Sequence, residues 1–471
     1  MKNHCRWMRG ILFAGAIALL LSCGGGGGGG GSASSVGVGS GTAAGSSGDN
    51  SAGTGTGGGS GTGTAGGADG SGGTGSTGSA GGTSGGTDGT STAGNGSGDG
   101  VGSGGTGVST ADATGVGSVG GLGSIILNGV RYKTYPEAPD GIAPANFSLE
   151  DTSELQIGMS VRIAGKIDSE FTAATAQQVV SAAELRGAVS TINVGAGSFV
   201  VMGTTVSTDN ATVWSGATGL TDIVAGSVVQ VWGLPSAPGT LRATRVELKP
   251  TSSEPLVTGF AQNLDTLSKS FTLGQLTVHY DNAAFSGGID ESTLAGALVR
   301  LRGSVAPVAG VFNATKVQGW YAVPKQNAAA VQLAGVITDY SGLAAPFKIL
   351  GTTVDASNAR VTGGLPTSIG NGVKVEVDGF MSNGILVVKK LRIRNVPGVG
   401  GPVDFTLIGA IGGYQSPSDF KVQGRQVNAG RPGTVFENGT AVDLANGRRV
   451  TVVGDTVENG VLIAKRVTFA P

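Results

Sequence analysis

The stretch Gly158-Met159-Ser160-Val161-Arg162-Ile163-Ala164-Gly165 contains the pattern that decides the fold. Between its two glycines, apolar residues alternate with polar or small ones, and Val161 and Ile163 fall on the same side. Alternation with a period of two indicates a β-strand with one buried face. Glycines at the two ends are typical of turns, bulges or barrel corners. This stretch therefore predicts a half-buried strand.

The same pattern recurs along the chain. Each copy has Gly, six further residues and Gly again, with Val three positions after the first Gly and an aliphatic residue five positions after it. The copies are Gly158–Gly165, Gly226–Gly233, Gly296–Gly303, Gly372–Gly379 and Gly447–Gly454. Further strand patterns precede and follow each copy, so the sequence predicts five repeats of one β unit.

A unit of roughly 70 residues suits one small closed domain better than a solenoid repeat. Closure into a small antiparallel β-barrel removes exposed strand edges, and no helical periodicity competes with it. We therefore expect an all-β chain of tandem small barrels. The expected repeats are 108–184 (repeat 1), 185–253 (repeat 2), 254–328 (repeat 3), 329–402 (repeat 4) and 403–471 (repeat 5).

The N-terminus has the layout of a lipoprotein signal peptide. Basic residues precede the apolar stretch Ile11–Leu21, which is too short to span a bilayer as a mature helix. The sequence Leu20-Leu21-Ser22-Cys23 resembles the bacterial lipobox, whose cysteine thiol takes a diacylglyceryl group. We expect residues 1–22 to be the signal peptide and Cys23 to be lipidated. An ordinary secretory peptide with a chance cysteine is the alternative. Gly24 favours sorting to the outer membrane, on either its periplasmic or its cell-surface face.

Composition changes sharply after the cysteine. Residues 23–107 are almost wholly Gly, Ser, Thr and Ala, and this segment holds most of the 90 glycines in the 471-residue chain. Such a segment cannot bury enough apolar surface to offset its ordering entropy, so we expect a disordered linker. The formal net charge is only −1, which makes a nucleic-acid partner a poor expectation.

The opening of repeat 1 resembles a known family. Its residues Gly120-Gly121-Leu122-Gly123-Ser124-Ile125-Ile126-Leu127-Asn128-Gly129-Val130-Arg131 are similar to a repeat family of unknown function in envelope lipoproteins of Gram-negative bacteria. The resemblance implies OB-like barrels behind a lipobox and a Gly-rich linker, in an envelope location. It implies no catalytic residues.

Motifs for catalysis and metal binding are sparse. The chain has two cysteines and two histidines, and removal of the signal peptide leaves one of each, so no Cys/His metal cluster is expected. His279 is the only candidate histidine base, and it sits alone on a predicted strand. The adjacent acids Glu150 and Asp151 are expected to face opposite sides of a strand. We therefore predict no catalytic residues, no metal and no cofactor.

Two groups of residues are candidate contact surfaces. Trp232, which we expect to face outward, and the pair Trp320 and Tyr321 offer aromatic surface in repeats 2 and 3. Lys390, Arg392 and Arg394 share one face of a predicted strand, where they could meet anionic glycan or lipid headgroups. The simpler interpretations are packing against linkers for the aromatic residues and a solvated strand face for the cations.

These observations favour a non-enzymatic, lipid-anchored envelope protein whose repeats act as a binding or spacer module. Tandem copies would raise avidity for a repetitive partner, such as an envelope glycan or an envelope protein. A purely structural spacer is the second hypothesis. The alternative from a different class is an envelope enzyme with a site between repeats or in repeat 3, near His279 and the Trp320–Tyr321 end.

Overall fold

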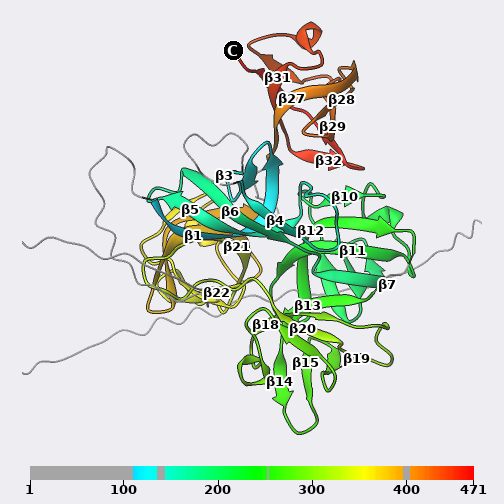
Figure 1. The fold of residues 1–471 in the computed structure, drawn as a ribbon, viewed down its shortest axis with the longest axis vertical. Helices are drawn as coiled ribbons and strands as arrows, with labels where there is room; N and C mark the ends of the chain where they lie inside the picture. Colours follow the sequence, from blue (N-terminus) through cyan, green and yellow to red (C-terminus); the bar gives the residue numbers. More distant parts are fainter. Residues whose placement is uncertain (1–109, 135–143, 252–253, 396–403) are drawn as a thin grey trace, which may run out of the picture. The chain divides into compact units, whose positions relative to one another are not determined.

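The computed structural model describes residues 110–134, 144–251, 254–395 and 404–471. Regular structure in these ranges consists of β-strands and short 3-10 helices, without an α-helix (Figure 1). In this part of the chain, no helix has the length and hydrophobicity needed to traverse a bilayer. The all-β prediction is therefore confirmed, whereas the predicted signal peptide, Cys23 and the predicted linker lie outside the described residues.

The strands of repeat 1 pair in a closed order. β1 pairs with β2, β2 with β3, β3 with β6, β6 with β5, and β5 returns to β1. The β3–β6 ladder is parallel and the other ladders of this order are antiparallel, while β4 adds a second parallel ladder on β6. The bounds are β1 (Thr110–Leu122), β2 (Ile125–Leu127), β3 (Val130–Lys133), β4 (Asn146–Leu149), β5 (Ser160–Asp168) and β6 (Ala173–Ser181).

Repeats 2 and 4 have the same strand order, again closed by one parallel ladder. Repeat 2 comprises β7 (Leu185–Asn193), β8 (Ser198–Val201), β9 (Thr204–Ser207), β10 (Val213–Ser215), the 3-10 helix η1 (Leu220–Asp222), β11 (Val228–Pro235) and β12 (Thr240–Lys249). Repeat 4 comprises β21 (Ala330–Thr338), β22 (Phe347–Ile349), β23 (Thr352–Asp355), β24 (Arg360–Thr362), η3 (Pro366–Ser368), β25 (Lys374–Ser382) and β26 (Ile385–Asn395).

Repeats 3 and 5 follow the same plan, but some of their strands are interrupted. Repeat 3 comprises β13 (Leu256–Phe260), β14 (Gln262–Asp265), β15 (Ser270–Leu273), β16 (Leu276–His279), β17 (Ala284–Ser286), η2 (Glu291–Thr293), β18 (Leu298–Arg302), β19 (Val311–Asn313) and β20 (Lys316–Gly319). Repeat 5, drawn in orange and red in Figure 1, comprises β27 (Phe405–Ser416), β28 (Asp419–Val422), β29 (Arg425–Asn428), β30 (Val435–Glu437), η4 (Ala441–Asp443), β31 (Arg449–Gly454), β32 (Thr456–Glu458), β33 (Val461–Ile463) and β34 (Arg466–Phe469). Each set of strands lies within one predicted repeat, although the exact boundaries stay predictions.

The two glycines of the repeated pattern have different roles. Gly158, at the start of the first copy, has φ of +84°, a left-handed conformation that favours glycine. Gly165, at the end of that copy, lies where the β5–β6 register shifts, and a Cβ there would meet Thr175 O at 2.0 Å. The first glycine therefore permits the turn into the strand, and the second permits a bulge that bends it.

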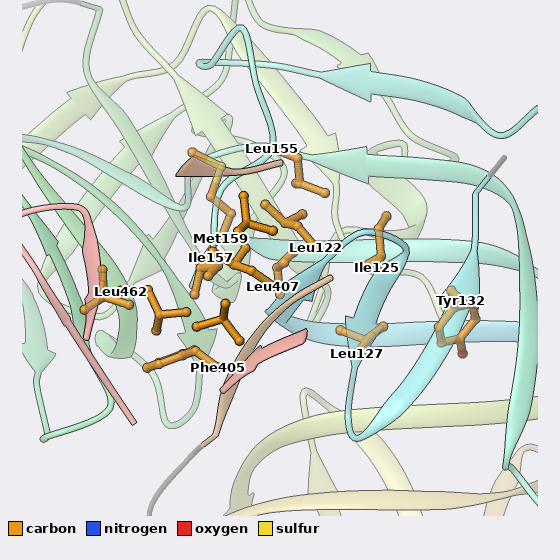
Figure 2. Packing of buried hydrophobic residues seen from close by; sticks show 14 of the residues in the cluster. Leu122, Ile125, Leu127, Tyr132, Leu155, Ile157, Met159, Phe405, Leu407 and Leu462 are labelled. Carbon is orange, nitrogen blue, oxygen red and sulfur yellow. The ribbon is translucent and has the colours of Figure 1, made fainter. Parts of the chain in front are cut away.

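Strands of different repeats also pair. β1 forms parallel ladders with β21 of repeat 4 and with β27 of repeat 5, and β7 of repeat 2 pairs with β13 of repeat 3. The apolar cores follow the same connections. Figure 2 shows Leu122 and Met159 of repeat 1 in one buried cluster with Phe405 and Leu407 of repeat 5. A second cluster joins repeats 2 and 3. Repeats that are distant in sequence therefore share a core.

Candidate functional site

An open groove of about 850 Å³ lies between repeats 1 and 5. Repeat 1 lines it with residues of β2, β3 and β4, and repeat 5 lines it with residues of β27, β29 and β31. We call it the 1/5 groove. The side chains that define its chemistry are Arg131, Lys133, Phe147, Glu154, Arg425 and Arg449.

Strand alternation places two cations on the repeat 1 side of the 1/5 groove. Val130 and Tyr132 of β3 are buried, whereas Arg131 and Lys133 are exposed. Because successive side chains of a strand point to opposite faces, both cations lie on the outer face of β3. In β4, which pairs with β6 as β3 does, the residue Phe147 is 44% exposed.

Arg425 of β29 connects the two sides of the groove. Its NH1 atom donates to Glu154 Oε2 over 2.7 Å, and its NH2 atom donates to the carbonyl oxygen of Leu155 over 2.8 Å. Its Nε atom is buried and has no hydrogen-bond partner. Arg425 therefore holds repeat 5 against repeat 1 and retains one donor that is not used by the protein.

The charge of the 1/5 groove is positive. Its described lining contains four cations, Arg131, Lys133, Arg425 and Arg449, and one carboxylate, Glu154. The lining includes no His, Cys or second acid among the described residues, so it offers no carboxylate pair and no nucleophile beside a histidine base. No cluster of metal-ligating side chains is found in the described part of the chain either. Cations therefore outnumber acids in the described lining of the groove, and one of them, Arg425, is paired with Glu154.

A second polar cluster is buried where repeats 1, 2 and 3 meet. Glu184 is 0% exposed, and its carboxylate accepts hydrogen bonds from Ser160 Oγ of repeat 1 and from the backbone N–H of Gly233 of repeat 2. Trp320 Nε1 donates to it over 3.2 Å, and the Tyr321 hydroxyl also donates to it. Burial raises the pKa of Glu184 to about 7, although the hydrogen bonds act in the opposite direction.

Three arginines converge on Asp151 in the same region. Arg186 of repeat 2 and Arg300 and Arg302 of repeat 3 all donate to its carboxylate. Burial alone would raise the pKa of Asp151, but the arginine charges and hydrogen bonds hold it below its usual value. The expectation that Glu150 and Asp151 face opposite sides is wrong, because both accept from Arg300. They lie in a bend after β4, where Asp151 has φ of +67° and strand alternation no longer applies.

The prediction of an exposed aromatic surface in repeats 2 and 3 is wrong. Trp232, Trp320 and Tyr321 are 0%, 6% and 5% exposed. The side chain of Trp232 does point away from the core of its own repeat. Its neighbour Val231 lies in the apolar cluster of repeats 2 and 3, whereas Trp232 lies in the cluster that joins repeats 1 and 5. A neighbouring repeat covers the side that alternation turns outward, so these aromatic residues stabilise the assembly of repeats.

The basic strand face has the predicted alternation, but contacts within the chain already use it. Leu391 and Ile393 are buried, and the three cations lie on the other face. Lys390 Nζ donates to the carbonyl oxygen of Glu170, and Arg392 NH1 donates to that of Asn128 over 3.1 Å. Arg392 and Arg394 also pair with Glu376. An external anionic partner for Lys390, Arg392 and Arg394 stays a prediction.

Sequence reasoning missed the 1/5 groove, the buried carboxylate of Glu184 and the three arginines that donate to Asp151. The alternation of Arg131 and Lys133 around Tyr132 was a usable signal for a basic outer face on β3. Nothing in the sequence brings Arg425 within reach of Glu154, because they are 271 positions apart. Trp320 and Tyr321, which the enzyme alternative placed near its site in repeat 3, are buried against Glu184.

Comparison with known families gives two matches to one family. Residues 186–247 and 408–468 match the family described as Domain of unknown function (DUF5666). The two matches fall on repeats 2 and 5 and begin within β7 and β27, the first strands of these repeats. No curated protein matches the chain. The matches show two copies of one domain type, in agreement with the expected repeat family of unknown function.

Proposed function

We propose that this chain is a lipid-anchored, non-enzymatic protein of the bacterial cell envelope, in which five OB-like barrels form a binding module. The observation that carries the proposal is the 1/5 groove, which collects four cations without an acid–base pair in its described lining. The other prominent charged groups, Asp151 and Glu184, are engaged in contacts between repeats. Of the groove cations, Arg425 also pairs with Glu154 of repeat 1, and we place the ligand of this protein at the groove.

The strand order supports the OB-like assignment. Each repeat pairs its strands in the order one, two, three, last, next-to-last. The third strand and the last long strand of each repeat run parallel to each other, as β3 and β6 do in repeat 1. An OB-fold is a five-stranded Greek-key barrel that binds oligonucleotides or oligosaccharides on the face of its second and third strands. In repeat 1 these strands are β2 and β3, and both contribute to the 1/5 groove.

The proposed anchor is at the other end of the chain. Lipidation of Cys23 after removal of residues 1–22 would fix the protein to the outer membrane, and residues 23–107 would give the repeats reach as a flexible coil. In this proposal the partners are the membrane, through the anchor, and an envelope glycan or protein, through the groove. Nucleic acid is not a partner.

The spacer hypothesis is less well supported. A spacer of independent units predicts that deletion of one repeat shortens the reach and leaves the rest intact. The ladders of β1 with β21 and β27 join repeat 1 to repeats 4 and 5, so removal of repeat 1 would expose strand edges in two other repeats. We therefore favour a binding module over a spacer.

The anchor can be tested by metabolic labelling with palmitate in a Gram-negative host, followed by separation of the membranes. We expect the full chain to carry label and to sediment with the outer membrane. Cys23→Ala should lose both properties. Cys5→Ala is the matched control and should keep them, because Cys5 lies in the segment that is removed. Labelled Cys23→Ala protein, or an unlabelled full chain, would contradict the proposed anchor.

A further inference from the structure

We propose that the 1/5 groove binds an acidic oligosaccharide, whose sugar units carry carboxylate groups such as those of uronic acids. This inference rests on the proposed function, which supplies a binding module in the envelope, and it adds the chemical class of the ligand. The charges of the groove lining, the ring of Phe147 and the placement of the groove on the strands of repeat 1 support the inference.

Cations reach the groove from both of its sides. Arg131 and Lys133 come from β3 of repeat 1, and Arg425 and Arg449 come from β29 and β31 of repeat 5. Arginine presents a planar fork of donors that matches a carboxylate, and lysine adds a compact positive charge. A ligand with repeated carboxylates can therefore contact both repeats at once. A single carboxylate would satisfy only part of this set.

The rest of the lining suits a sugar better than a bare anion. Phe147 is 44% exposed and offers an apolar ring face to the C–H groups of a sugar. The Ser124 hydroxyl and Gln423 Oε1 add neutral groups for hydrogen bonds with sugar hydroxyls, while Gln423 Nε2 already donates to Ile408 O over 3.0 Å. Ligand sites typically combine an apolar surface with a few convergent polar groups, as this groove does.

Two observations favour a glycan over a nucleic acid. The whole chain carries a formal charge of −1, so it lacks the broad positive field that attracts a phosphate backbone. Proteins that bind single-stranded nucleic acid stack successive bases on several aromatic side chains. Phe147 is the one aromatic residue in the described lining of the groove.

The test is isothermal titration of the full-length lipoprotein in detergent micelles with hexagalacturonate. Maltohexaose is the neutral comparison, and a single-stranded DNA oligonucleotide is the polyanion comparison. We expect binding of hexagalacturonate alone. Arg131→Gln and Lys133→Gln should each weaken it about tenfold, which corresponds to the loss of one charge-assisted contact. Arg448→Gln is the matched control, because Arg448 precedes Arg449 but stacks on Phe469 and does not line the groove.

The remaining outcomes have defined meanings. Absence of hexagalacturonate binding, or binding that neither groove variant weakens, would overturn the inference. Equal binding of DNA would show that the groove binds polyanions in general, and this result would also overturn the inference. Recovery of shortened sugar after incubation, detected by mass spectrometry, would overturn binding without catalysis. The palmitate experiment is independent of all these outcomes, so failure of the ligand class and failure of the proposed anchor can be distinguished.

Discussion

Arg300 of repeat 3 and Asp151 of repeat 1 form a buried ion pair across 149 positions of sequence. The Arg300 side chain is 1% exposed, and it also donates to Glu150 over 2.7 Å and to the carbonyl oxygen of Ala183 over 3.0 Å. Its guanidinium lies 4.9 Å from the ring centroid of Trp320. One side chain of β18 in repeat 3 therefore holds both the bend after β4 and the end of repeat 1.

Replacement of this arginine should destabilise the assembly of repeats. Arg300→Gln leaves the carboxylates of Glu150 and Asp151 without their main partner, and loss of one member of a buried pair costs about 3–5 kcal/mol of the free energy of unfolding. Urea denaturation followed by tryptophan fluorescence would measure it. Arg448→Gln, at an exposed position where the contact with the Phe469 ring is lost, should change that free energy by no more than about 1 kcal/mol. Equal effects of the two variants would contradict the assigned role of Arg300.

The buried Glu184 predicts a pH dependence of stability. Burial raises its pKa to about 7 in the folded chain, above its value in the unfolded chain, so the folded state binds the proton more tightly. The contribution of Glu184 to the free energy of unfolding is therefore fully present below the pKa of the unfolded chain. It is lost as the pH rises through about 7. Glu184→Gln cannot titrate at this position. The stability of the original chain minus that of Glu184→Gln should fall between pH 5 and pH 8, by on the order of 1 kcal/mol per pH unit at most. A flat difference would show that Glu184 does not titrate with a raised pKa.

The second glycine of the repeated pattern should not tolerate a side chain. In repeat 5, a Cβ on Gly454 would meet Ile463 O at 2.0 Å, whereas a Cβ on Gly412 of the same repeat meets no atom within 4 Å. We expect Gly454→Ala to lower the midpoint of thermal unfolding, with a loss of about 1–3 kcal/mol from overpacking. Gly412→Ala should be nearly neutral. A neutral Gly454→Ala would contradict the close approach of the backbone.

A hydroxyl connects repeats 1 and 4. Tyr132 donates to Gln332 Oε1 over 2.5 Å, and Gln332 Nε2 donates to Asp378 over 2.8 Å. Tyr132→Phe would leave the buried Gln332 oxygen without its donor, which costs about 1–3 kcal/mol. Tyr340→Phe, at a partly exposed position, is the control and should have little effect on the urea midpoint. Similar urea midpoints for the two variants would contradict a stabilising hydrogen bond between Tyr132 and Gln332.

The repeated strands were predictable because their signals are local. Glycine and valine spacing set the strand, its turn and its bulge within one repeat, and each appears where the pattern placed it. The exposure of Trp232 was not predictable from that spacing. Alternation turns this side chain away from the core of its own repeat, but only the position of another repeat decides whether water or protein covers it.

The 1/5 groove was also beyond the reach of the sequence. Arg131 and Arg449 line it from opposite ends of the folded part, and no local pattern relates them. Strand alternation could identify Arg131 and Lys133 as outward-facing cations, although not the repeat that faces them. Cations that are adjacent in sequence, such as Lys390 to Arg394, are recognisable from the sequence, but their charges are largely used by Glu376 and by backbone oxygens of repeat 1.

The pairing of β1 with β27 has a consequence for biosynthesis. The segment around Gly121 leaves the ribosome long before its partner Thr406 has been made, since synthesis proceeds from the N-terminus. Until then, the edge of β1 at Gly121, the first strand in the described part of the chain, stays unpaired and can recruit strands from other chains. We therefore expect nascent or truncated chains that lack the last repeat to depend on chaperones and to aggregate more readily than the finished protein.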